Sequence, residues 1–87
     1  MPEISRFFGI IISIYMKDHL PPHFHARYGE FWGKIEIATG EIIEGNLPRR
    51  ALRLIQDWVE LHKTELLVNF VEAQKDIPNI KPIEPLQ

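Results

Sequence analysis

The sequence predicts an α+β domain: an antiparallel β-meander of three to four strands, packed by one long C-terminal helix and followed by an extended, proline-containing tail. Apolar and polar residues alternate in the first half of the chain, as in strands with one buried face. In the second half, apolar residues recur every three or four positions, as in an amphipathic helix. Three prolines within the last twelve residues exclude a regular helix there.

The length of 87 residues supports one modest hydrophobic core, so we predict a single domain over residues 1–87. Its meander occupies 1–45, its helix 46–76 and its tail 77–87. The chain has no cysteine, which excludes disulfides, thiolate zinc sites and cysteine nucleophiles. Its formal net charge of -2 gives no general basic surface, so any nucleic acid would be contacted through a partner or a local arginine patch.

The apolar run near the N-terminus is expected to be a strand. It lacks the basic start and the small-residue cleavage site of a signal peptide, and it is shorter than the roughly 20 residues of a membrane helix. We therefore expect a cytoplasmic protein that does not contact a membrane. Residues 7–16, "FFGIIISIYM", are apolar on both faces of a strand, which is typical of a central position. The "LPP" that follows ends this strand.

The next two strands are predicted from strict alternation. In "HFHARY", His23, His25 and Arg27 share one face, and the intervening residues face the core. "YGEF" is predicted to be a tight turn, and "FWGKIEI" alternates again. Thr39 and Gly40 then close a hairpin to a short last strand, because glycine supplies the positive φ that such turns need.

The predicted helix runs from about Pro48 to Lys75, with proline at its favoured first position. Its length is unusual for so small a domain, which leaves a kink near Lys63 and Thr64 as the alternative. The core-facing line at helical spacing consists of Leu52, Ile55, Val59, His62, Leu66, Phe70 and Ala73. Trp58 is also expected in the core.

A second apolar line on the helix is formed by Leu54, Leu61 and Val68, which recur every seven residues outside the core-facing line. We predict that this line binds another chain, either a different protein or a second copy. The alternative is that Ile80, Ile83 and Leu86 of the tail fold back over it. Arg49 and Arg50 oppose the helix dipole at its N-terminus and are candidates for contacting an anionic group on a partner.

The stretch "DHLPPHFH" contains three of the four histidines and is the candidate polar site. Strand geometry places His23, His25 and Arg27 in a row, and Asp18 and His19 enter the same turn. One interpretation is catalytic: histidine acts as general acid and base, Arg27 or Lys17 steadies a developing anion, and the protein is a metal-independent ribonuclease.

A second interpretation is a metal site, with two imidazoles from the histidine pair and a third ligand from Asp18, His19 or His62. The positive charge of Arg27 beside the pair argues against it, so we expect no bound zinc and no cofactor. The third interpretation, which we favour, is that these side chains hold the turn in shape or form a polar patch that contacts a partner.

Four segments, "MPEISRFFGI", "DHLPPHFHARYGE", "LPRRALRLIQDWVELHKTELL" and "IKPIEPL", resemble a family of small bacterial proteins known as domain of unknown function 4160. The most specific of them is the string from Asp18 to His25. No activity is established for this family, so no catalytic residue is carried over. Its members are often encoded beside another small protein, of domain of unknown function 2442, in pairs that look like toxin–antitoxin modules.

The resemblance therefore implies a partner-binding component of a toxin–antitoxin-like two-gene module, carrying a polar patch of histidine, aspartate and arginine. The ribonuclease and a small metal-binding protein are the two alternatives. We lean against an enzyme.

Overall fold

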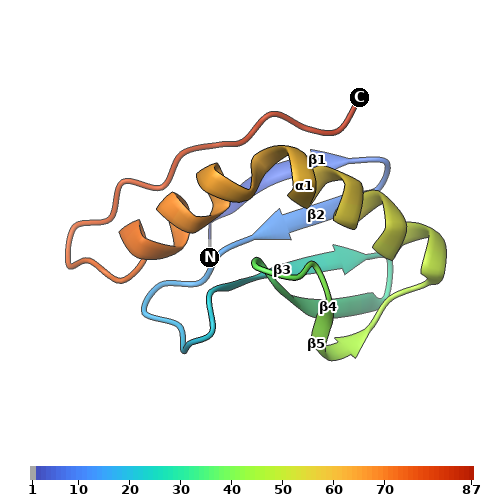
Figure 1. Cartoon of the computed structure of the whole chain (residues 1–87), viewed down its shortest axis with the longest axis horizontal. Helices are drawn as coiled ribbons and strands as arrows, with labels where there is room; N and C mark the ends of the chain where they lie inside the picture. Colours follow the sequence, from blue (N-terminus) through green and yellow to red (C-terminus); the bar gives the residue numbers. More distant parts are fainter. Residues whose placement is uncertain (1) are drawn as a thin grey trace.

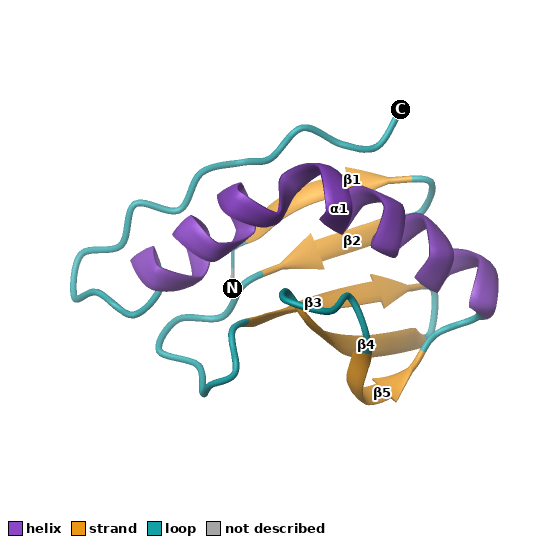
Figure 2. Cartoon of the chain, in the orientation of Figure 1, coloured by secondary structure: helices purple, strands orange, loops and turns teal. Residues whose placement is uncertain are grey.

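The computed structural model describes residues 2–87, and Met1, the first residue of the predicted domain, lies outside them. The described residues form a five-stranded antiparallel sheet and one helix (Figures 1 and 2). The α+β class and the meander are confirmed, because the strands lie in the sheet in chain order. The elements are β1 (Glu3–Phe7), β2 (Ile10–Ser13), β3 (His23–Tyr28), β4 (Phe31–Glu36), β5 (Ile42–Asn46) and α1 (Arg49–Glu72).

The predicted first strand, residues 7–16, is wrong, and so is the count of three to four strands. This stretch contains the end of β1, a two-residue turn and the whole of β2. Phe8 and Gly9 both have positive φ, at 50° and 81°, which is the requirement of a tight type I′ hairpin turn. The extra strand therefore arises from a turn that starts with an aromatic residue instead of asparagine, aspartate or glycine.

From residue 10 onward, the strand residues lie on the faces of the sheet that were predicted for them. Ile10, Ile12 and Ile14 are buried, and so are Phe24 and Ala26 of β3. The YGEF stretch forms the turn between β3 and β4, and the β4–β5 hairpin closes around Thr39 and Gly40, as predicted. These inward-facing side chains form the core on which α1 packs.

The helix begins just after Pro48 and lies across one face of the sheet (Figure 1). Trp58 is completely buried, and Ile55, Val59, Leu66 and Phe70 of the predicted line are buried with it. The backbone leaves helical geometry at one residue, His62, with φ -128° and ψ 23°. The predicted long helix is thus present, with its irregularity one residue before the suggested kink at Lys63 and Thr64.

Residues 78–87 have neither helix nor strand structure and run beside α1 on the β1 side of the sheet (Figure 2). The Ile83 N–H donates to the Ile4 carbonyl oxygen of β1 at 2.7 Å. The Trp58 indole donates to the Glu84 carbonyl oxygen at 2.9 Å. Ile83 is buried, whereas Ile77 is exposed. This segment therefore joins the helix to the sheet edge at β1.

Within residues 2–87, no helix has the length and apolarity needed to cross a lipid bilayer.

Candidate functional site

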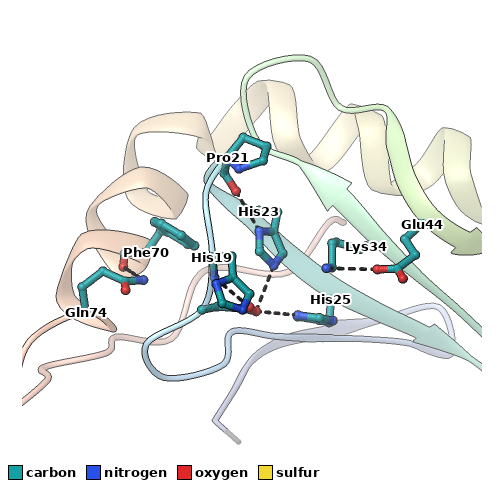
Figure 3. A network of polar contacts seen from close by, with 9 residues as sticks. His19, Pro21, His23, His25, Lys34, Glu44, Phe70 and Gln74 are labelled. Carbon is teal, nitrogen blue, oxygen red and sulfur yellow. Dashed lines mark hydrogen bonds and ion pairs between the residues drawn. The ribbon is translucent and has the colours of Figure 1, made fainter.

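The site is centred on one carboxylate oxygen. Asp18 Oδ2 lies 2.9 Å from His23 Nε2 and 3.0 Å from His25 Nε2. Both histidines belong to β3, with one residue between them, so their rings share one face of the strand. Asp18 comes from the loop between β2 and β3, which brings its side chain back onto the start of β3. Figure 3 shows the two rings converging on this point.

His23 is the buried member of the cluster, with only 2% of its side chain exposed. Its ring packs against Phe70 of α1, with centroids 5.7 Å apart. Its Nδ1 lies 2.7 Å from the Pro21 carbonyl oxygen, so both ring nitrogens have protein partners. His23 lies on the face of the strand that was predicted for it. Its side chain is nevertheless buried, because the end of the helix covers the start of β3.

His25 is more accessible, with 17% of its side chain exposed. Its ring stacks on Tyr15 at a centroid distance of 3.9 Å and an interplanar angle of 14°. Its neighbour across the strand pair is Lys34, whose ammonium pairs with Glu44 at 3.0 Å. Stacking on one side and the carboxylate contact hold the imidazole plane of His25 in a single orientation.

Asp18 is strongly biased toward its ionised form. Burial raises the pKa of this carboxyl group, but hydrogen bonds from His25, from the backbone N–H of His19 and from His23 outweigh it and lower the pKa to about 2. The two imidazoles thus face a negative charge.

Of the other predicted site residues, His19 and Arg27 are not in this cluster. The His19 backbone N–H donates to Asp18 Oδ1 at 2.9 Å, but its side chain is exposed. Arg27 is exposed further along β3, beside Ile11 and Trp32 of the neighbouring strands. His62, the other suggested metal ligand, bonds instead to Glu65 on its own helix at 2.6 Å. The structure therefore brings three of the predicted side chains together and leaves the side chains of the others outside the cluster.

A cleft of about 630 Å³ opens on the face of the sheet opposite the core side chains. Its lining includes Tyr15, His25, Arg27, Trp32, Lys34 and Glu44. His25 is the one member of the Asp18 cluster that lines it. The cleft gives solvent a route to that imidazole, and it places Arg27 near the site without a bond to it.

Residues 9–70 match the family described as Domain of unknown function (DUF4160). The chain belongs to this family. The match spans the Asp18 cluster and nearly all of α1, and it leaves out β1 and residues 78–87. No curated protein and no solved structure matches the chain.

The DUF4160 chain also exposes apolar side chains on α1. Leu61 is 68% exposed and Val68 is 53% exposed, as expected for the second apolar line. Leu54, the third member of that line, is only half-exposed and packs against the core beside Phe8 and Tyr28. Val71, which is 58% exposed, was not predicted to take part. Its position three residues after Val68 is the sequence signal that could have indicated its exposure on the same side of the helix.

Arg49 and Arg50 are both exposed at the N-terminal end of α1. Arg50 lines a pocket of about 460 Å³ together with Phe8, Tyr28, Ala51 and Leu54. These arginines are therefore accessible, and they lie at the opposite end of the helix from Val68 and Val71.

Proposed function

We propose that this protein is the partner-binding component of a toxin–antitoxin-like two-gene module, and that α1 binds a basic amphipathic segment of the neighbouring small protein. The observation that carries the proposal is an exposed stripe on the solvent side of α1. This exposed stripe consists of Leu61, Thr64, Val68 and Val71.

The spacing of the exposed stripe fits a partner helix. Thr64, Val68 and Val71 follow one another at intervals of four and three residues, which is the repeat of positions that meet another helix in a coiled coil. Leu61 precedes them on the other side of the non-helical residue His62. Leu67, which is 38% exposed, widens the apolar area on one side. The stripe spans about 15 Å of helix, enough for three turns of a partner to pack against it.

The tail does not cover the exposed stripe, although the sequence left that alternative open. Its hydrogen bonds with α1 go to Trp58 and Asn69, which are buried on a different side of the helix, and to the Glu72 side chain one turn after Val68. Leu61, Val68 and Val71 remain more than half exposed with the tail in place. The apolar surface is therefore available to another chain.

The charges around the exposed stripe favour a different protein over a second copy. Asp57 and Glu65 lie one helical turn on either side of Leu61, and Glu60 lies one turn before Thr64. The nearest lysine, Lys63, directs its ammonium to the Ala38 carbonyl oxygen. Two copies would bring acidic borders together, whereas a partner segment with lysine or arginine beside its apolar residues would complement them.

The ribonuclease alternative has less support from the geometry. It requires two histidines that can each exchange a proton with substrate. His23 is buried and bonded at both ring nitrogens, so His25 alone is accessible from the cleft.

The proposal is tested by co-expressing the chain with the neighbouring protein of domain of unknown function 2442 and measuring the mass of the complex by light scattering. We expect a complex with the wild-type chain, weakened by salt, and none with the Leu61→Glu, Val68→Glu double variant. The matched control is Ile43→Glu with Ile77→Glu, which also replaces two exposed apolar side chains by glutamate but lies outside the exposed stripe.

A complex that survives the double variant contradicts the proposal. So does a wild-type chain that is a dimer by itself and becomes a monomer in the double variant, because the occupant would then be a second copy. Circular dichroism of each variant verifies that it is folded.

A further inference from the structure

We propose that Asp18, His23 and His25 form a binding site for one divalent transition-metal ion, such as Zn²⁺. This inference is independent of the partner proposed for α1. It concerns the convergence of three side chains, each of which offers one ligand atom within 4.8 Å of those of the other two. Two imidazoles and one carboxylate are a ligand set that binds first-row divalent metals.

The hydrogen atoms on His23 provide the first argument. A carbonyl oxygen only accepts hydrogen bonds, so the Nδ1 atom that faces the Pro21 carbonyl oxygen carries a hydrogen. In a neutral imidazole, Nε2 then has a free lone pair, and it faces the lone pairs of Asp18 Oδ2 at 2.9 Å. A bound ion can accept the lone pair of this Nε2 and one of the carboxylate oxygen together.

A metal ion can accept a lone pair from each Nε2 and from the carboxylate oxygen together. Histidines that bind metals also commonly donate their other N–H to a backbone carbonyl, which fixes the ring. The Pro21 carbonyl oxygen does this for His23.

The distances provide the second argument. Ligand atoms about 2.1 Å from one ion and at right angles to each other are about 3.0 Å apart. Asp18 Oδ2 is 2.9 Å and 3.0 Å from the two Nε2 atoms, so these two ligand-to-ligand distances match such an arrangement. The rings are held in place by Phe70 on one side and Tyr15 on the other.

The surroundings remove the objection raised from the sequence. Arg27 lines the same cleft as His25, but it is exposed, and its guanidinium forms no hydrogen bond or ion pair with any of residues 2–87. The ammonium of Lys34 is neutralised by Glu44. Because His25 lines the cleft, an ion would enter from there, and three protein ligands leave a coordination position for water or another small ligand.

The test uses the full chain, purified without a histidine tag and stripped with a chelator. Calorimetric titration with Zn²⁺ should give one ion per chain, and Co²⁺ should give the visible absorption of a bound, low-symmetry ion. His25→Ala and Asp18→Asn should each lower Zn²⁺ affinity by about 100-fold or more. His19→Ala and His62→Ala are the controls, and both should bind as the wild type does.

The Asp18→Asn variant keeps the shape of the side chain, so loss of binding in a folded protein cannot be attributed to unfolding. The absence of saturable Zn²⁺ and Co²⁺ binding by the wild type would overturn the proposal. Equal binding by wild type and His25→Ala would overturn it too, as would loss of binding in His19→Ala, since each would place the ion elsewhere.

Discussion

Asn69 and Lys81 are joined by two hydrogen bonds. The Asn69 Nδ2 donates to the Lys81 carbonyl oxygen at 2.8 Å, and the Lys81 N–H donates to Asn69 Oδ1 at 3.0 Å. The asparagine side chain, on α1, therefore bonds the tail backbone as a neighbouring strand would. It is 2% exposed, so water does not replace these partners when the amide is removed.

Asn69→Ala should destabilise the protein by about 1–3 kcal/mol, because it removes the two hydrogen bonds that hold the tail backbone at Lys81. Urea denaturation followed by tryptophan fluorescence measures this. Asn79→Ala is the matched control, since Asn79 is exposed and its side chain has no hydrogen bond among residues 2–87. Its backbone N–H donates to Glu72. If both variants change stability equally, the paired hydrogen bonds do not hold the tail.

Ile83→Ala should cost about 2–4 kcal/mol, the usual range for removing a buried isoleucine side chain. The side chain of Ile83 is 4% exposed, whereas that of Ile77 in the same segment is 89% exposed. Ile77→Ala should therefore stay within about 0.5 kcal/mol of the wild type. Thermal unfolding of both variants measures these losses. A small loss of stability in Ile83→Ala would mean that the tail is not docked in solution.

Gly45→Ala should be more harmful than Gly29→Ala. Both glycines have positive φ, 87° and 60°, so both variants incur the left-handed penalty of about 1 kcal/mol. A Cβ at Gly45 would lie 2.5 Å from the Trp32 carbonyl oxygen, whereas nothing lies within 4 Å of one at Gly29. Chemical denaturation should show a further loss of about 1–3 kcal/mol for Gly45→Ala. Equal losses would show that the β4–β5 contact relaxes freely.

The two histidines of β3 should contribute unequally to stability in chelator-treated protein. His23→Ala removes a buried ring and two hydrogen bonds, so it should cost about 2–4 kcal/mol. His25→Ala should cost less than about 1.5 kcal/mol, because its ring borders the open cleft. The losses of stability in the two variants are compared from the denaturant concentrations at their unfolding midpoints. A larger loss for His25 would reverse the assignment of His23 as the residue that anchors the turn.

The parts of the fold that the sequence predicted well are those in which burial alternates regularly. Ile10, Ile12, Phe24 and Ile35 are buried as their alternation requires. Shifting the pattern by one residue would turn these side chains away from the covered face of the strand. The first hairpin was missed because Phe8, which holds a left-handed conformation, is not a residue that signals a turn. Neighbouring hydrophobic residues then made two short strands look like one.

The site was predicted only in part, because strand geometry fixes the face of a side chain and not its depth. His23 and His25 share a face as predicted, yet only His23 lies under the end of α1. Arg27 was expected to join them from the same alternation, but it is two positions further along β3 and exposed. Burial of this kind depends on where a distant helix ends, which local spacing does not encode.

The hydrogen bond between Ile83 and Ile4 has a consequence for the order of folding. It joins residues 79 positions apart, whereas β1 and β2 meet across a two-residue turn. Because the entropy lost on closing a loop grows with its length, the hairpins and α1 form before the tail reaches β1. On unfolding, the tail detaches first and leaves a partly open form whose sheet and helix are still intact. In that form the outer edge of β1 is bare, and the concentration of this rare species sets how readily one chain adds a strand to another.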